Sequence, residues 1–190
     1  MGKRKKIDKE TILKAAAELA EEKGLENATL NRLAEKLEIK TPSLYNHMSG
    51  LNELTESLAQ FAIRKLEAVL LDSAVGKAKE EALSGIAMAY RRYAKENPEL
   101  YKAILRIPAS RDEELRREGL SVVGILHQVM EPYRYSKEDE VHFIRGFRSA
   151  LHGFVSLEEA GFFDGKVDAD ASYVRLVSGL IGMLAVREVP

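Results

Sequence analysis

The sequence predicts an all-α protein of about nine helices, and three observations lead to this fold class. First, apolar residues recur with the helical period, as Ile12, Ala16 and Leu19 do at i, i+4 and i+7. Second, capping residues, glycines and prolines divide the chain into segments of helical length. Third, no stretch alternates apolar and polar residues as a half-buried strand does, and no hairpin turn joins two such stretches.

The composition is that of an ordinary globular protein. The 190 residues are 45% hydrophobic and 31% charged, with 29 Lys and Arg against 30 Asp and Glu. Because the chain has no cysteine, it has no disulfide framework, no cysteine-ligated zinc and no catalytic thiol. No segment resembles the apolar region of a secretory signal or reaches about 18 uncharged apolar residues, so we expect a cytoplasmic protein.

Asp8 and Gly24 delimit the first predicted helix, because Asp is a favoured N-cap and Gly a favoured C-terminal stop. Thr29 can cap a second helix, which ends near Leu37. A third helix begins at Thr41-Pro42, where the missing N–H of proline costs nothing.

Only Glu38-Ile39-Lys40 separates the second helix from the third, and such a tight connection indicates a helix-turn-helix. The third helix is short, and Ser43, Tyr45, Asn46 and His47 show no apolar pattern. Hydroxyl, amide and ring groups of this kind suit base edges and phosphates. A short polar helix by itself is more often a solvated connector; its position after a tight turn and before a long amphipathic helix favours DNA recognition.

The remaining helices follow from the same signals. Ser49-Gly50 precedes a long helix whose apolar stripe, from Leu51 past Leu70, is interrupted at Lys65. Ser110 and Ser136 are followed by acidic residues three positions later, as helix-starting serines often are. Further helices are expected near residues 75–96, after Asn97-Pro98, from Ser110 to about Met130, from Ser136 to about Ala160, and from Asp168 or Asp170 to about residue 188.

Between about Ile12 and Leu58 the sequence resembles the TetR family, the tetracycline-repressor-like transcription regulators of bacteria. Its most specific stretch is Thr41-Pro42-Ser43-Leu44-Tyr45-Asn46-His47-Met48. The resemblance implies a DNA-binding module over residues 1–50, an effector-binding and dimerisation domain over residues 51–190, and a homodimer.

The resemblance also assigns roles to single positions. Base contacts are expected from Asn31, Thr41, Pro42, Ser43 and Asn46. Phosphate contacts are expected from Thr29, Tyr45, His47 and Leu51. Two positions depart from the family pattern: Glu38 replaces the turn glycine, at a position prone to the left-handed conformation, and Leu51 replaces a phosphate-binding lysine. We expect the basic arm, with Arg4 and Lys5, to supply part of the missing charge from the minor groove.

The charge is divided unevenly along the chain. Residues 1–50 contain ten Lys and Arg and eight Asp and Glu, a net charge of +2, whereas residues 51–190 contain 19 and 22, a net charge of −3. An excess this small gives weak electrostatic attraction to DNA. We therefore expect a dimer that places two modules on one duplex.

The second half of the chain is expected to bind a small, largely apolar effector. Leu151-His152-Gly153 is similar to the Trp-His-Gly motif of one branch of TetR-family effector domains, with leucine in place of tryptophan. Large side chains with polar tips suit a pocket between helices. The candidates are Phe61, Met88, Tyr93, Tyr101, His127, Phe147 and His152. Core packing is the alternative for each, and His152 can equally lie at a helix crossing of the dimer interface.

In the last helix, small residues alternate with apolar ones and allow another helix to approach closely. We expect residues 136–160 and 168–188 of two subunits to form an isologous interface. The residues assigned to it are Val174, Val177, Ser178, Ile181 and Gly182. Burial within the same subunit is the alternative.

Together these features predict a ligand-responsive regulator, most often a repressor, that binds a palindromic operator as a dimer and is released by its effector. The alternatives are a small-molecule-binding protein or a partner-binding regulator with a vestigial DNA module. The four histidines lack metal-site spacing, and no nucleophile elbow, phosphate loop or dinucleotide-binding glycine pattern occurs. We therefore expect no catalytic residue, metal, cofactor or membrane partner.

Overall fold

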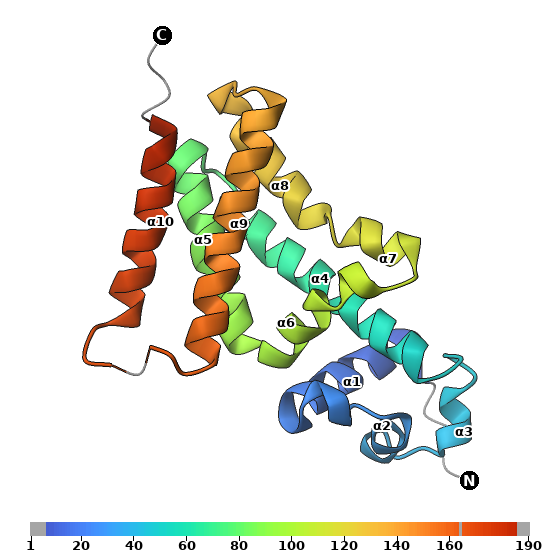
Figure 1. Ribbon diagram of the computed structural model, residues 1–190. Helices are drawn as coiled ribbons and strands as arrows, with labels where there is room; N and C mark the ends of the chain where they lie inside the picture. Colours follow the sequence, from blue (N-terminus) through green and yellow to red (C-terminus); the bar gives the residue numbers. More distant parts are fainter. Residues whose placement is uncertain (1–6, 164, 186–190) are drawn as a thin grey trace. The chain divides into compact units, whose positions relative to one another are not determined.

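The computed structural model describes residues 7–163 and 165–185, and these residues form ten α-helices and no β-strand (Figure 1). This confirms the all-α prediction. They divide into two compact units: unit 1 comprises residues 7–65 and 97–119, and unit 2 comprises residues 66–96, 120–163 and 165–185. The predicted basic arm with Arg4 and Lys5 lies outside the described residues. None of the helices described is long and apolar enough to cross a membrane.

Unit 1 contains the three N-terminal helices and a later segment of the chain. Its elements are α1 (Lys9–Lys23), η1 (Leu25–Asn27), α2 (Leu30–Lys36), α3 (Thr41–Leu44), the first part of α4 (Leu51–Ala74), α6 (Pro98–Leu105), η2 (Ile107–Ala109) and α7 (Glu113–Glu118). The predicted signals at both ends of α1 are confirmed. The Asp8 side chain accepts from the Thr11 backbone N–H at 2.8 Å, which lowers the pKa of Asp8, and Gly24 ends the helix at a φ of 90°.

The core of the helix-turn-helix contains Ile12, Ala16 and Leu19, which the helical period of the sequence places on one face of the first helix. Its fully or almost fully buried side chains are Ile12, Ala16, Leu19, Leu33, Ala34, Leu44, Met48, Leu54 and Leu58. α2 is in contact with both α1 and α3, and the small side chain of Ala34 on α2 is buried. This apolar core leaves the polar residues of α3 for the surface.

α6 is held against the N-terminal helices by carboxylates. Asn97 provides no side-chain cap for α6. Instead, the Glu21 carboxylate of α1 accepts from the backbone N–H groups of Glu99 and Leu100, at 3.2 and 2.9 Å. Glu99 in turn accepts from the Leu25 N–H at 2.7 Å. These contacts satisfy N–H groups that a helix start otherwise leaves unpaired, so they fix α6 to α1 and η1.

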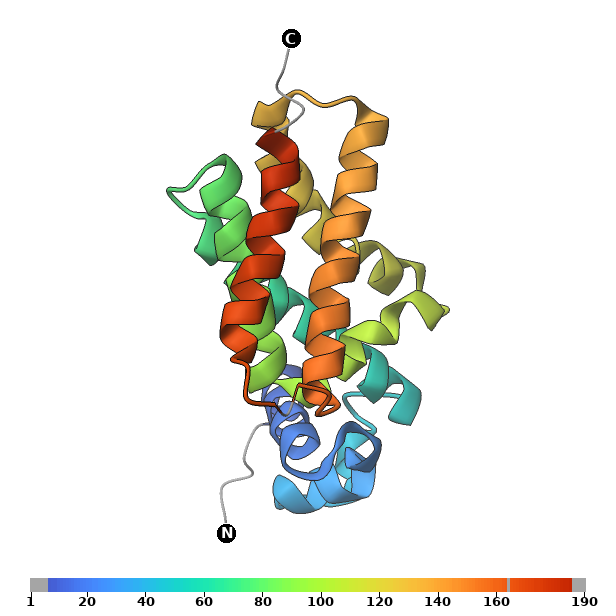
Figure 2. The same ribbon diagram turned by 60° about the vertical axis from the view of Figure 1, so that its left-hand side comes forward.

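Unit 2 is a helical bundle built around α5. Its elements are the last part of α4, α5 (Lys79–Glu96), α8 (Ser121–Met130), η3 (Glu131–Tyr133), α9 (Lys137–Glu159) and α10 (Ala169–Ala185). α5 packs against α8, α9 and α10, and the last two helices lie side by side in both views (Figures 1 and 2). Tyr173 is fully buried and donates to the Ala87 carbonyl at 2.7 Å, which joins α10 to α5.

A partly buried ion-pair network joins α5, α9 and α10. Arg91 donates two hydrogen bonds to Glu158, at 2.7 and 2.5 Å, and one to Asp170 at 2.7 Å. Its guanidinium also lies over the rings of Phe154 and Tyr173. The bonds from Arg91 lower the pKa of Glu158, so both groups are charged at neutral pH.

One predicted helix is wrong. The expected helix from Ser110 to Met130 is divided into α7 and α8, because α7 ends at Gly119. A Cβ on Gly119 would lie 2.7 Å from Cγ2 of Ile107, so η2 approaches too closely for a larger residue. The N-cap of α7 is Asp112, which accepts from Glu114 and Leu115, and not Ser110. At α9, by contrast, Ser136 caps the helix as expected and accepts from the Asp139 N–H.

Candidate DNA-binding site

The turn between α2 and α3 closes through two backbone hydrogen bonds. Ile39 N–H donates to Ala34 O and Glu38 N–H donates to Glu35 O, both at 3.0 Å. This is the Schellman pattern of helix termination, which places the residue after the C-cap in the left-handed region. That residue is Glu38, with a φ of 56°. The expectation that Glu38 adopts a conformation better suited to glycine is therefore confirmed.

α3 ends at Leu44, and together with the turn that follows it, residues 45–47, it forms a surface that is largely polar and open to solvent. Leu44 and Met48 are buried, whereas Pro42, Ser43 and Asn46 are exposed. Tyr45 is 56% exposed although it is a large aromatic residue. Burial in the helix-turn-helix core therefore does not account for the side chain of Tyr45.

Two of the predicted base-contacting residues touch each other. The Thr41 hydroxyl, at the start of α3, donates to Asn31 Oδ1 on α2 at 3.2 Å. Thr29 and His47 are half-buried at the margins of the same face. The Thr29 hydroxyl accepts from the Arg32 N–H at 3.5 Å as the N-cap of α2, and its own hydrogen remains available to a phosphate. Side chains from α2 and α3 thus form one polar surface.

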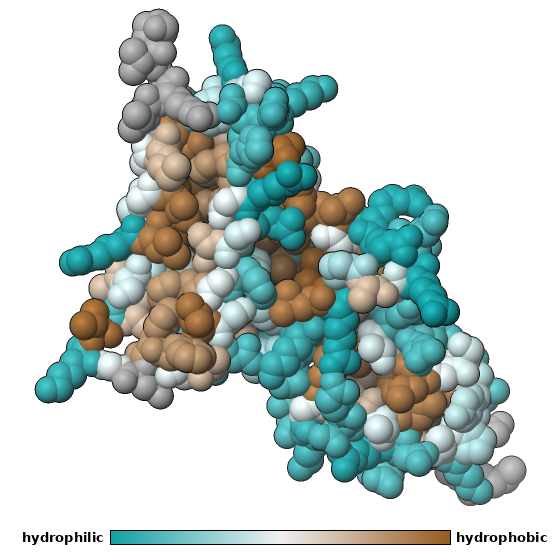
Figure 3. All heavy atoms as spheres, viewed as in Figure 1, coloured by the Kyte–Doolittle hydropathy of each residue, from teal (hydrophilic) through white to brown (hydrophobic). Residues whose placement is uncertain are grey.

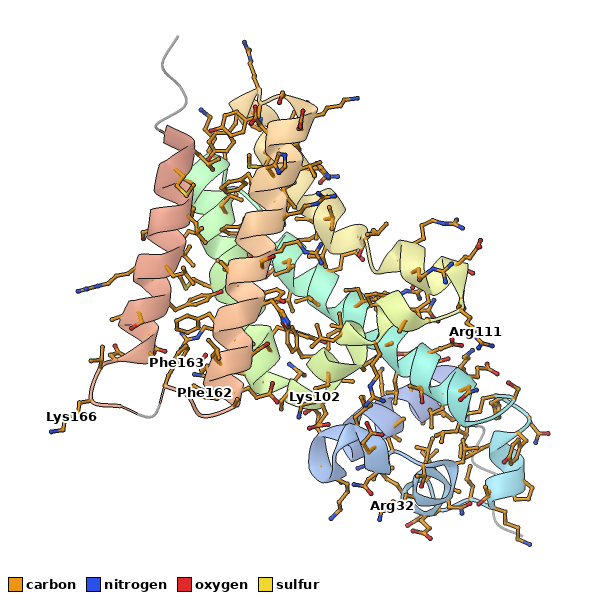
Figure 4. The ribbon with its side chains drawn as sticks, in the orientation of Figure 1. Arg32, Lys102, Arg111, Phe162, Phe163 and Lys166 are labelled. Carbon is orange, nitrogen blue, oxygen red and sulfur yellow. The ribbon has the colours of Figure 1, made fainter. Side chains whose placement is uncertain are left out.

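Sequence reasoning missed Arg32, which lies next to Asn31 on α2 and is exposed (Figure 4). The signal was available, because Arg32 follows the N-cap Thr29 by three residues on the polar side of α2. The nearby Lys36, in contrast, lies against Glu18 and Glu22 at 3.3 and 2.9 Å, which raises its pKa. Arg32 therefore contributes more positive potential to this surface than Lys36 does.

The start of α4 presents no cation of its own. Leu51, at the position of the family's phosphate-binding lysine, is 49% exposed. Glu53 accepts from the N–H and the hydroxyl of Ser49, at 2.7 and 2.9 Å, and its pKa is lowered chiefly by the Ser49 N–H. Lys9 lies 3.2 Å from Glu53 and offsets its charge. The start of α4 thus carries the apolar side chain of Leu51 and the carboxylate of Glu53 where the family has a lysine.

The structure places the candidate effector residues in several environments. Tyr93, Tyr101 and Phe147 are almost fully buried, and His127 binds Glu140 through Nδ1 at 2.6 Å. Met88 and His152 are half-buried, and the latter lies 3.5 Å from the Ser156 hydroxyl. Phe61 lines a cavity of about 430 Å³ in unit 1, and Phe147 lines one of about 280 Å³ in unit 2. These two residues therefore face different cavities.

The residues assigned to a dimer interface divide into two sets. Val177 and Ile181 are 1% and 8% exposed, because they form part of the core of unit 2. Their side chains are thus used within the subunit. Val174, Ser178 and Gly182 lie at the surface of α10. If α10 forms an interface, these three residues and their exposed neighbours are the ones that can take part in it.

Comparison with known proteins identifies the family. Residues 12–58 match the profile of bacterial regulatory proteins of the tetR family, and residues 83–180 match that of the tetracyclin repressor-like C-terminal domain. The chain is 32% identical to the uncharacterized HTH-type transcriptional regulator Rv0681 of Mycobacterium tuberculosis, over 90% of this chain and 79% of that protein. It is also 32% identical to the uncharacterized HTH-type transcriptional regulator YobS of Bacillus subtilis, over 85% and 84%.

A solved structure shows the same fold. A variant of TetR from Acinetobacter baumannii AYE, crystallised in complex with minocycline, superposes with a TM-score of 0.70 at 21% identity, over 97% of this chain and 100% of that chain. Both family profiles, and the relatives matched along most of their length, describe transcriptional regulators and not enzymes. The chain belongs to the TetR family of helix-turn-helix transcriptional regulators.

Proposed function

We propose that this regulator is a dimeric repressor that reads a palindromic operator with α3 and is released by a small molecule. The observation that carries the proposal is the polar surface of residues 41–47, held over a fully buried apolar core. Hydroxyl and amide groups on a helix that enters the major groove can distinguish base pairs. Exposed Asn31, Ser43 and Asn46 are the residues to which we assign this role.

Selection of bound duplexes from random DNA tests the reading role. A dimer with one helix-turn-helix in each subunit selects an inverted repeat, with half-site centres about 34–36 Å apart or a multiple of that distance. An enriched inverted repeat supports the proposal. No enrichment, with folded protein, contradicts it and favours a binding protein with a vestigial DNA module.

We assign dimerisation to the exposed face of α9 and α10. A Cβ added at Gly146, Gly153, Gly179 or Gly182 would meet nothing within 4 Å, so packing within the chain does not require these glycines. Each costs about 1 kcal/mol relative to alanine in a helix interior. The face also exposes Leu157, Val174 and Met183, and apolar surface gathers over α10 in Figure 3. Close approach of helices from a second subunit accounts for both features.

Light scattering after size-exclusion chromatography tests this proposed dimer, and a monomer at micromolar concentration contradicts it.

Release by a small molecule is supported by the structural similarity to a TetR that was crystallised with minocycline. An effector displaces the protein from DNA only if it binds the DNA-free state more tightly. The coupling is reciprocal, so DNA weakens effector binding by the same factor. Mass spectrometry of small molecules that copurify with the protein identifies candidates. Equal affinity of a candidate with and without operator excludes it as the effector.

A further inference from the structure

Carboxylates neutralise most cations of unit 1. Lys9, Lys14, Lys36, Arg64 and Arg106 each lie within ion-pair distance of a glutamate. Among the described residues, no carboxylate pairs with the exposed cations Arg32, Lys40 or Arg111. Arg32 and Lys40 belong to the helix-turn-helix itself. Arg111 is more than 70 residues further along the chain, so its presence in the same unit follows from the fold and not from the local sequence.

Hydrogen bonds on both sides fix the segment that carries Arg111. The Ser110 hydroxyl donates to Glu56 of α4 at 2.8 Å and accepts from the Asp112 N–H at 3.0 Å. Arg116 donates to the Ser110 carbonyl at 2.7 Å. The backbone at Arg111 is therefore attached to the N-terminal half of α4, while the guanidinium extends from the surface (Figure 4).

Arg111 faces the same hollow as the residues that begin α4. A cavity of about 740 Å³ is lined by Leu51, Asn52 and Thr55 on α4 and by Arg111 on the connecting segment. Arg106 also lines it but is paired with Glu26. Arg111 is thus the cation that can bind a phosphate near the start of α4, where Leu51 provides no charge. A guanidinium is suited to this role, because it is always charged and binds phosphate oxygens in pairs.

We infer that Arg111 is a phosphate-binding residue of the DNA site, which supplies from the α6–α7 segment the charge absent at Leu51. The inference rests on the proposed DNA-binding function. It also adds to the DNA-contacting surface a residue from the part of the chain that matches the C-terminal domain profile.

The salt dependence of binding to a random-sequence duplex of about 30 base pairs tests this inference, since phosphate contacts set that dependence. Arg111→Ala is expected to reduce the slope of log affinity against log salt by about 0.9 for each bound subunit. The affinity loss is several-fold at about 50 mM salt and smaller at about 200 mM. The matched control is Arg117→Ala, which removes an exposed arginine of α7 that does not line the cavity and is expected to change nothing.

A rescue variant separates a local contact from a general charge effect. Leu51→Lys in the Arg111→Ala background returns a cation to the same hollow and is expected to restore the slope. An unchanged slope in Arg111→Ala overturns the role of Arg111, and so does an equal reduction of the slope in Arg117→Ala. Neither result contradicts the proposed DNA-binding function. If the wild-type protein binds neither this duplex nor a selected operator, the proposed function and the inference both fail.

Discussion

The Thr41 hydroxyl donates to Asn31 Oδ1 at 3.2 Å, and this bond fixes how Asn31 is presented. Because its oxygen accepts from Thr41, the exposed asparagine has its NH₂ group left to donate. A donor in this position suits the acceptors of a purine edge or of a phosphate. We therefore propose that α2 and α3 act as one recognition surface.

Asn31→Asp tests the donor role, because it keeps the acceptor for Thr41 but removes both donors and adds a negative charge. We expect operator affinity to fall at least about tenfold, the loss of one good base contact. The melting temperature is expected to stay constant, since Asn31 is exposed. Thr41→Val removes the hydroxyl that binds Asn31 and that is itself assigned a base contact, but it adds no charge, so it is expected to have a smaller effect. A larger loss of operator affinity in Thr41→Val than in Asn31→Asp would show that the NH₂ donor of Asn31 does not determine binding.

Glu38→Gly is expected to stabilise the protein by about 1 kcal/mol, because a side chain at a φ of 56° is strained. The matched control is Glu35→Gly, at an exposed position inside α2, which is expected to destabilise by a similar amount. Urea unfolding of the two variants measures both effects. If both substitutions destabilise equally, the backbone strain at Glu38 is not significant.

Gly182→Leu is expected to weaken dimerisation without lowering the stability of the subunit fold, because its Cβ meets nothing in the chain. The added side chain holds the partner helix away. Gly124→Leu is the control, at an equally open glycine on α8 outside the proposed interface. Sedimentation velocity across a concentration series measures the two dissociation constants. A dimer equally stable in both variants excludes Gly182 from the interface.

The ion pair between Arg91 and Glu158 predicts how stability depends on acid pH. The folded-state pKa of Glu158 lies below its unfolded value, so its contribution is complete above the unfolded pKa of about 4.3 and is lost as pH falls through the folded pKa. Glu158→Gln is expected to cost about 2 kcal/mol at pH 7, since it leaves Arg91 paired with Asp170 alone.

The difference between wild type and Glu158→Gln is expected to shrink as the pH falls below about 4, because the wild-type carboxylate then becomes protonated. Urea unfolding at a series of pH values measures it. Glu80→Gln, at an exposed position of α5, is expected to leave the acid dependence of stability unchanged. A pH-independent difference for Glu158→Gln contradicts the assigned cause.

Local signals were sufficient for most helix boundaries. Asp8, Thr29 and Ser136 cap the helices predicted for them, because a side-chain oxygen next to free N–H groups acts within one turn. The left-handed turn at Glu38 is predicted differently, by the family resemblance, because the family has glycine at that position.

Features that depend on distant segments could not be predicted. At the break near Gly119, the approach of Ile107 leaves no room for a larger residue, and no periodicity in the sequence shows this contact. The capping of α6 by Glu21 joins residues about 80 positions apart. At the candidate interface, Val177 and Ile181 looked like their neighbour Val174 in the sequence, and only the packing of α10 shows which of them the subunit uses.

Tyr45→Ala tests whether the exposed face of α3 contributes affinity. Because Tyr45 is 56% exposed, truncation is expected to leave the dimer and the melting temperature unchanged. Loss of its assigned phosphate contact is expected to weaken binding several-fold on specific and random duplexes alike. Unfolding of the variant would instead show that Tyr45 is a core residue.

The central claim, that α3 reads the operator bases, is tested most directly by repeating the random-DNA selection with Asn46→Ala. Asn46 is exposed in the turn that directly follows α3, and we assign it a base edge. The variant is expected to select the same inverted repeat, with preference relaxed at one equivalent position in each half-site by about 1–3 kcal/mol. An unchanged preference at every position, in a variant that still binds DNA, would contradict the claim.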